Sequence, residues 1–350
     1  MESKIKIRVS KELESLLDSD AESFELYRVV KGKKALNRNE LLNSIVLHYC
    51  EDYQKKEEAM LRLVKAELPL GQDEAAQRIV YSFFKNEESK KTSYPCTLSF
   101  VPQQAVIPML SYVESEFLKG RTWSEFLRSL FFSYASLPQD KREWIVFRDV
   151  YEEIEKAIEN HHQVGLGRGK GMHVHVVSPY RIVSSKEELH NYVLFLDDSG
   201  YHTYRLNRIR FAIPSSLSCS FAQEDEEVFA RAIRYGPQYY YEKEGKEISV
   251  KLTEKGKRLY ESFYVHRPQY DEIKGDVYVF RCSSTHVLSY FSRFGKEAIV
   301  ISPLEEEKEM KKFYQEGLSA YEADLLEKKK ARDQERYRQR LEKKRKASPK

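Results

Sequence analysis

Between residues 168 and 210 the sequence interleaves basic and aromatic side chains, a combination suited to contacting a nucleic-acid strand. Guanidinium groups neutralise phosphates, and tyrosine rings stack on bases that are not paired. This pattern predicts a binding site for single-stranded nucleic acid, either RNA or DNA. Its predicted members are Arg168, Lys170, Tyr180, Arg181, Tyr192, Tyr204, Arg205 and Arg208.

A second group of cations lies at the start of the chain, where Lys4, Lys6 and Arg8 alternate with branched apolar residues. A period of two predicts a half-buried strand with a cationic outer face. These cations would contact nucleic acid if the strand belongs to a DNA-binding ribbon. The alternative is an amphipathic strand whose lysines only protect an exposed edge from unwanted pairing.

The sequence lacks the patterns of common catalytic and nucleotide-binding sites. Residues 165–171 (GLGRGKG) match neither glycine-rich phosphate-binding pattern, and no GxSxG or HExxH motif occurs. Four histidines gather around one predicted hairpin, and a metal site or a histidine- or metal-dependent nuclease is the least favoured alternative. These histidines are His161, His162, His173 and His175. We therefore expect no enzyme activity, no metal and no cofactor.

Composition and charge narrow the class of protein. No run of 18 apolar residues predicts a membrane span, and the first residues lack the apolar stretch of a signal peptide. The four cysteines lie far apart and form no metal-binding or disulfide pattern. We expect a cytoplasmic protein. The net charge of +4 is uneven, because residues 327–350 hold 12 Lys or Arg against 4 Asp or Glu.

The elements predicted at the N-terminus explain how the first cations would be positioned. A helix follows the strand from Lys11, and a basic turn at 31–34 leads to a second helix. Asn37 and Glu40 mark the start of that helix with the spacing of a capping box. This order resembles the ribbon-helix-helix family, whose dimers pair two strands against the major groove. The resemblance implies that backbone amides near Asn37 lie at a phosphate.

The same pattern occurs a second time. A short strand at 97–101 precedes a helix that starts at Pro102, and Thr122 with Glu125 repeats the capping-box spacing. This second strand carries no Lys or Arg, so it is a poor groove-binding element. The sequence leaves open whether the two units pair within one chain or between chains.

Three short blocks carry most of the residues of the first site. They are PYRIV at 179–183, NYV at 191–193 and YRLNRI at 204–209, and they resemble the PYRLV, WYL and FRLDRI blocks of the WYL family. Asn191 stands in place of the family's Trp, and Asn207 in place of its acidic residue. The resemblance implies an Sm-like five-stranded barrel that binds ligands or single-stranded nucleic acid and regulates an attached activity.

Within a strand at 204–209, alternation would place Tyr204 and Arg208 on one face and Arg205 on the other. One arginine should then matter more for binding, and we favour Arg208, which the family motif keeps beside its last apolar residue. The alternative is a barrel whose tyrosines pack in the core and whose arginines decorate the surface.

Residues 248–301 predict the order strand, helix, strand, strand, helix, strand. This order resembles the C-terminal extension of many WYL domains, which is often involved in self-association. We expect a homodimer, formed by this extension and by the first strand, whose apolar residues need a partner to bury them. Beyond Leu326 the predicted helix is polar all round, which indicates a solvated helix or a weak nucleic-acid arm.

The predicted fold class is α+β, with ribbon-helix-helix-like modules, an Sm/SH3-like WYL β-barrel, a ferredoxin-like extension and a charged helical tail. The predicted domains are a ribbon-helix-helix-like module (1–60), a helical connector (61–94), a second degenerate module (95–145), the WYL domain (146–215), a linker helix (216–247), a C-terminal dimerisation domain (248–325) and a basic tail (326–350). This plan resembles the WYL accessory proteins of type VI-D CRISPR systems, which bind single-stranded RNA and stimulate an RNA-guided effector nuclease. That nuclease would then be a partner. The alternative is a ligand-responsive DNA-binding transcriptional regulator.

Overall fold

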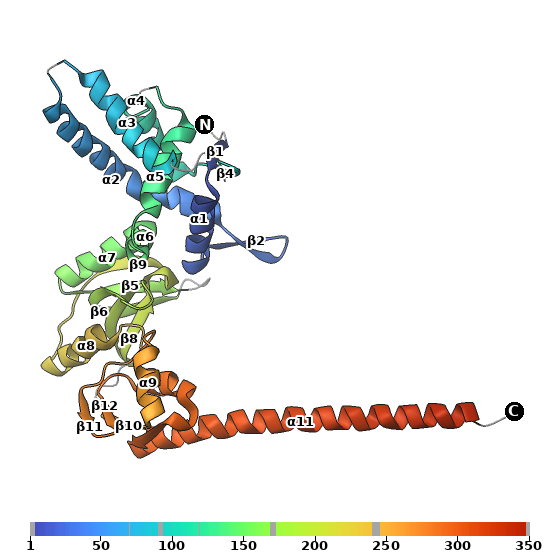
Figure 1. The fold of residues 1–350 in the computed structure, drawn as a ribbon. Helices are drawn as coiled ribbons and strands as arrows, with labels where there is room; N and C mark the ends of the chain where they lie inside the picture. The colour runs from blue at the N-terminus through green and yellow to red at the C-terminus, as the bar shows by residue number, and fades with distance from the viewer. Residues whose placement is uncertain are drawn as a thin grey trace. The chain divides into compact units, whose positions relative to one another are not determined.

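The computed structural model describes residues 4–69, 71–89, 94–118, 120–168, 173–239 and 246–347. The chain divides into two compact units, Met1–Phe229 with Gly236–Gln238, and Ala230–Tyr235 with Tyr239–Lys350. Both contain helices and small antiparallel sheets, which confirms the predicted α+β class (Figure 1). No helix in the described part of the chain is long and apolar enough to cross a membrane.

The first unit begins with a two-stranded ribbon made of strands that are far apart in the sequence. β1 (Ile5–Val9) pairs antiparallel with β4 (Cys96–Phe100), and Ile7 lies opposite Leu98. Alternate side chains of both strands are buried, so the ribbon has one face on the core and one exposed face. The two predicted units therefore pair within one chain. The apolar residues of β1 need no partner chain, and this reason for predicting a homodimer no longer holds.

The helices beneath the ribbon begin where the sequence predicted caps. The Asn37 side chain accepts a hydrogen bond from the Glu40 amide at 3.4 Å, and Thr122 and Glu125 form a complete capping box. These polar groups satisfy amides that have no partner inside the helix. The helices and the short 3-10 turn are α1 (Lys11–Ser23), α2 (Arg38–Glu67), α3 (Asp73–Ser89), η1 (Gln104–Val106), α4 (Ile107–Glu116) and α5 (Trp123–Ala135).

A β-hairpin separates α1 from α2, where the sequence predicted only a basic turn. β2 (Tyr27–Val30) pairs antiparallel with β3 (Lys33–Leu36). Lys31 and Gly32 connect them with φ angles of 50° and 74°. Two successive positive φ angles are typical of the type I′ turn, whose twist matches that of a tight hairpin. The hairpin is an insertion into the predicted ribbon-helix-helix order.

A five-stranded sheet follows α6 (Gln139–Val146) and α7 (Arg148–Glu159). Its strands are β5 (His162–Arg168), β6 (Val174–Ser184), β7 (Asn191–Asp197), β8 (Gly200–Arg205) and β9 (Ile209–Ser218). Their order is β8-β7-β6-β5-β9, and neighbouring strands are antiparallel. The number of strands is as predicted, but β8 and β9 do not pair in the described residues. The closed barrel predicted for 146–215 is therefore not shown.

The predicted continuous strand at 204–209 is wrong. The 3-10 turn η2 (Leu206–Arg208) separates β8 from β9. Leu206 and Asn207 are neighbours and both are buried, which the alternation of a strand does not allow. The backbone turns at 206–208, and this turn lets two successive side chains be buried in the first unit.

The glycines at 165–171 do not all belong to a hairpin turn, because β5 continues to Arg168. A Cβ on Gly167 would lie 2.2 Å from the Phe211 ring of β9, and one on Gly165 would lie 2.6 Å from Val174 of β6. Glycine is needed at both positions because side chains of the neighbouring strands occupy the space that a Cβ atom would take. The rest of the predicted turn, 169–171, lies outside the described residues.

The second unit contains a four-stranded antiparallel sheet in the order β11-β12-β10-β13. The chain passes through it as strand, helix, strand, strand, helix, strand, the order predicted for a ferredoxin-like extension. The elements are β10 (Ile248–Leu252), α9 (Glu254–Ser262), β11 (Glu272–Lys274), β12 (Val277–Phe280), α10 (Ser284–Phe291), η3 (Ser292–Glu297) and β13 (Ala298–Ser302). β13 is an end strand of this sheet, so one of its edges is unpaired within the described residues.

A helix of 44 residues, α11 (Leu304–Ala347), ends the described chain. Met310 near its start is buried in the core of the second unit. From Gln315 to Gln339 every side chain is exposed, including Leu318 and Tyr321. Within the described part of this helix, apolar side chains are therefore buried only near its N-terminal end.

Candidate nucleic-acid interface

The two motif positions that depart from the WYL pattern, Asn191 and Asn207, are buried where the sheet meets the N-terminal module. Glu143 of α6 accepts hydrogen bonds from the Asn191 amide at 2.5 Å and from its side chain at 2.9 Å. The Glu143 carboxylate also contacts His190 Nδ1 at 3.0 Å. Asn207 donates to the Ser23 carbonyl at 3.3 Å. Both asparagines therefore connect the sheet to the N-terminal module of the same unit. Sequence patterns did not single out Glu143, because its partner Asn191 is far from it in the sequence.

Tyr180 and Tyr192, two of the predicted stacking residues, are used for packing. The Tyr180 ring stacks on Phe229 of α8 (Gln223–Tyr235) at 4.3 Å between ring centres, and Phe221 covers it edge-on at 5.2 Å. Tyr192 is buried and donates its hydroxyl to Glu188; burial, followed by this hydrogen bond, raises the pKa of Tyr192 well above its usual value.

Tyr204 is half-buried, with its ring edge-on to Phe195 at 4.6 Å. It packs against the core cluster of the sheet. The alternative that the tyrosines pack is therefore the better description of all three rings, and a nucleic acid would be held mainly by the arginines.

Arg181 and Arg205 share one face of the sheet. Arg181 of β6 lies opposite Leu194 of β7, and Arg205 of β8 lies opposite Tyr192 two residues earlier in β7. Directly opposed residues and residues two apart point to the same side. The row formed by Ile182, Val193 and Tyr204 points to the other side, into the core cluster. On the arginine side, Leu194 and Tyr192, which lie between the two arginines, are also buried, so only the ends of this row reach the surface.

Neither of these arginines has a carboxylate partner among the described residues. Arg181 is exposed, and the half-buried Arg205 has a guanidinium Nε that is buried without a hydrogen-bond partner. Four other arginines of the first unit are paired with carboxylates. The pairs are Arg38 with Asp18, Arg121 with Glu57, Arg142 with Asp20 and Arg148 with Asp52. A half-buried charge without a partner is costly, so an anionic ligand at Arg205 would recover that cost.

Arg208 lies in η2, apart from this row. It is exposed, and its Nε is 3.6 Å from the half-buried Glu25. The prediction that Arg205 and Arg208 lie on opposite faces of one strand is wrong, because the strand ends at Arg205. Arg168 ends β5, but its side chain and the whole of Lys170 lie outside the described residues.

Two histidines share one buried carboxylate at another end of the sheet. His175 Nε2 lies 3.1 Å and His202 Nε2 lies 3.2 Å from the Asp197 oxygens. Burial alone would raise the pKa of Asp197, but hydrogen bonds from Ser199 and the two imidazoles hold it below its usual value. The sequence had grouped His175 with His173, not with His202. No group of three or more His, Cys, Asp or Glu in the described residues could hold a metal ion.

The outer face of the ribbon presents the predicted N-terminal cations. Lys4, Lys6 and Arg8 are exposed, while Ser99 and Thr97 lie opposite the last two on β4. The cationic surface therefore covers one strand of the ribbon only. At the start of α2, the Asn37 amide already donates to the Leu26 carbonyl at 2.9 Å and the Glu40 amide to the Asn37 side chain at 3.4 Å, so both amides have partners where a phosphate contact was predicted.

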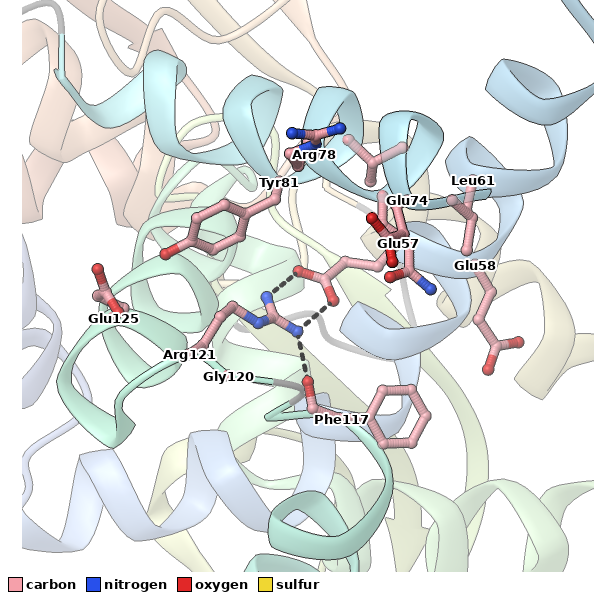
Figure 2. Close-up of a pocket in the computed structure, with 12 residues that line it drawn as sticks. Glu57, Glu58, Leu61, Glu74, Arg78, Tyr81, Phe117, Gly120, Arg121 and Glu125 are labelled. Atoms are coloured by element: carbon pink, nitrogen blue, oxygen red, sulfur yellow. Dashed lines mark hydrogen bonds and ion pairs between the residues drawn. The ribbon is translucent and has the colours of Figure 1, made fainter. Parts of the chain in front are cut away.

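A cavity of about 670 Å³, which no sequence pattern predicted, lies among α2, α3 and α5 (Figure 2). Arg121 donates to both oxygens of Glu57 at 2.8 and 3.0 Å on its wall. Tyr81 and Phe117 supply aromatic surface, and Glu74 supplies a further carboxylate. Its volume lies in the range of small-molecule sites.

These modules define a class of protein: a ribbon-helix-helix-like pair of units in one chain, a five-stranded sheet, and a ferredoxin-like unit ending in a long helix. No family model and no curated protein matches the sequence. A solved structure described as a CRISPR Cas-related protein is similar over 93% of this chain and 95% of its own, with a TM-score of 0.64 and 20% identity. The two proteins share a fold.

A second solved structure, the proteasome accessory factor B/C (PafBC) of Arthrobacter aurescens, aligns with 64% of this chain and 39% of its own. The TM-score is 0.25 and the identity 14%, too low for the two folds to be equated.

Proposed function

We propose that this protein is a non-catalytic nucleic-acid-binding regulator that binds single-stranded RNA, or DNA, through Arg181 and Arg205 of the five-stranded sheet. The observation that carries the proposal is the lack of a carboxylate partner for these two arginines in the described residues, beside four paired arginines in the same unit. A guanidinium without a carboxylate is ready to accept a phosphate in the same geometry.

Binding through these arginines would depend mainly on the nucleic-acid backbone. The rings of Tyr180 and Tyr192 are packed, so they add little base stacking. Contacts to phosphate release counterions and carry no sequence information, so affinity should fall with salt and vary little with sequence. Single strands are favoured over duplexes because their flexible backbone can follow a small curved sheet.

The test is fluorescence anisotropy with unstructured RNA, single-stranded DNA and duplex DNA. Arg205→Ala should weaken binding to single strands by about tenfold, the cost of losing a hydrogen bond to a charged group. Arg181→Ala, at an exposed position, should cost less. Lys156→Ala is the matched control, because α7 packs on the opposite, core face of the sheet. Equal affinity of the parent and Arg205→Ala would contradict the proposal.

We further propose that the partner of the RNA-bound protein is the RNA-guided ribonuclease of a type VI-D CRISPR system. The shared fold with a CRISPR Cas-related protein supports this setting. Adding the protein to such a ribonuclease should raise its rate of RNA cleavage. Arg205→Ala should reduce this stimulation in proportion to its loss of RNA affinity; stimulation without any RNA binding would separate the two activities and contradict the model.

A homodimer formed through the second unit is part of the same proposal. Ile299 and Ile301 on the end strand β13 are 54% and 43% exposed. An unpaired strand edge with apolar side chains favours pairing with a second copy. Replacing both isoleucines by Lys should reduce the sedimentation mass from two chains to one. A parent protein that already sediments as one chain at micromolar concentration would contradict this.

The ligand-responsive regulator of duplex DNA is the second candidate. The cavity among α2, α3 and α5 supports it, because α2 and α5 also contribute to the core beneath the cationic ribbon. A ligand there should raise the thermal midpoint of the protein and change its affinity for duplex DNA. A protein that binds single strands but no duplex, with or without added small molecules, would exclude this candidate.

A further inference from the structure

The β2–β3 hairpin has no face that packs on the rest of the described chain over its outer part. Residues 28–34 are all exposed, and Val29 and Val30 have exposed fractions of 64% and 43%. A two-stranded hairpin on its own is only marginally stable in water. The hairpin therefore adds little to the core, and its outer part is available for contact with another molecule.

The hairpin is strongly and uniformly basic. Residues 27–36 (YRVVKGKKAL) contain Arg28, Lys31, Lys33 and Lys34 and no acidic residue. None of these cations pairs with a carboxylate in the described part of the chain. Lys34 lies over the Tyr27 ring at 3.7 Å, which holds its ammonium group on one face. Four like charges on one short arm repel each other, and a polyanion would remove that repulsion.

Cations lie on both faces of the hairpin and at its tip. Arg28 and Lys33 share one face, because Arg28 pairs with Ala35 and Val30 pairs with Lys33. Lys34 lies on the other face, opposite Val29, and Lys31 is in the turn. Charge distributed around an arm in this way suits a flexible phosphate backbone that wraps it better than one flat acidic surface.

The base of the hairpin is fixed beside the arginine-bearing sheet. Ser23 contacts His190 Nε2 at 3.2 Å and accepts a hydrogen bond from Asn207 on its carbonyl. Glu25 lies 3.6 Å from Arg208, and the buried Phe24 packs edge-on against His190. From Glu25 to the turn the strand extends roughly 20 Å at the usual rise per residue. The β2–β3 hairpin thus begins next to η2, and its cations lie farther from the sheet than its base does.

We propose that the β2–β3 hairpin is a second binding site for the backbone of the same nucleic-acid strand that the sheet holds, and that it lengthens the bound segment. This inference rests on the proposed function. A strand that occupies the sheet must continue by several nucleotides before it reaches the tip, since single-strand sites of this kind cover about 4–16 nucleotides. Affinity should therefore depend on oligonucleotide length, and the hairpin should account for that dependence.

The experiment compares unstructured RNAs of about 8 and about 30 nucleotides with a variant in which Arg28, Lys31, Lys33 and Lys34 are Ala. On the long RNA the variant should bind at least roughly tenfold more weakly, with a salt slope lower by about 0.7 for each lost contact. On the short RNA it should bind like the parent. A second variant that combines Arg28→Lys, Lys31→Arg, Lys33→Arg and Lys34→Arg keeps the charge and should bind both RNAs like the parent.

Each other outcome overturns the inference in a distinguishable way. If the parent binds RNA and the Ala variant binds both lengths equally well, the hairpin is no binding site, while the proposed function stands. If the loss is the same at both lengths, the hairpin does not lengthen the bound segment. If the parent binds neither RNA, the proposed function fails and the inference fails with it. Circular dichroism and thermal unfolding of each variant show whether the remaining fold is intact.

Discussion

The N-terminal module contains two antiparallel strand pairs, and only one of them has a core beneath it. β1 and β4 bury alternate side chains, including Ile7 and Phe100, and expose polar side chains on the other face. β2 and β3 expose both faces of their outer part, including Val29. The same backbone pairing therefore supports the fold in the ribbon and only presents side chains in the hairpin. The cations of a strand do not show whether it supports the core; the side chains on its opposite face do.

Removing a large side chain from under the ribbon should have the largest effect. Phe100→Ala should lower the free energy of unfolding by about 3–5 kcal/mol, because a fully buried ring is replaced by a cavity. Val29→Ala in the hairpin is the matched variant and should change it by less than about 0.5 kcal/mol. Urea denaturation measures both. Similar losses would mean that the hairpin is as much a part of the core as the ribbon.

Replacing Lys4, Lys6 and Arg8 by Ala tests whether the supported ribbon also contacts duplex DNA. If it does, the slope of log affinity against log salt should fall by about 0.9 for each lost phosphate contact, and affinity should fall roughly tenfold. Replacing Thr97 and Ser99 on the neighbouring strand by Ala is the control, since the same face changes without loss of charge. Unchanged duplex affinity after loss of the three cations would leave the ribbon with a structural role only.

The helix starts in the two halves of the ribbon module should be equally important. Asn37→Ala and Thr122→Ala should each lower the free energy of unfolding by about 1 kcal/mol, because each removes an N-terminal cap. Thr122→Ser keeps the hydroxyl and should cost much less. Thermal unfolding measures the three variants. A loss at only one of the two starts would show that the halves are not equivalent.

The smallest global effect is expected at the turn of the hairpin. Gly32→Ala places a side chain at a φ of 74°, which strains the turn but opens no cavity, since nothing lies within 4 Å of the new Cβ. The free energy of global unfolding should change by less than about 0.5 kcal/mol. Hydrogen exchange of the hairpin amides should nevertheless become faster, because the hairpin opens locally. Unchanged exchange would mean that the turn does not limit hairpin stability.

Sequence patterns predicted those features of the fold that depend on residues close together in the sequence. The caps at Asn37 and Thr122 were recognised because a polar side chain three residues before a Glu has a defined partner. The alternation at 4–9 predicted a ribbon strand with an exposed cationic face, and the structure places Lys6 and Arg8 on that face. The order of strands and helices along residues 248–301 of the second unit was also predicted.

The parts that were missed depend on contacts between distant residues. The break after Arg205 has no glycine or proline to mark it, and it is needed because Asn207 reaches Ser23. The hairpin was missed because its strands are short and have no buried face, so they show no alternation of apolar residues. The partners of His175 and Asn191 lie on strands and helices that the sequence does not bring together.

Because β1 and β4 belong to one chain, the ribbon module is a fused dimer rather than a symmetric one. In a dimer of identical chains each substitution appears twice, and the surface suits a palindromic target. In a single chain the two strands of the ribbon can differ in sequence. One strand can therefore carry cations while the other carries none, as Arg8 and its neutral partner Thr97 show. If the ribbon binds duplex DNA, as the second candidate function requires, it would bind the two orientations of a target unequally, whereas a twofold-symmetric ribbon would bind them equally.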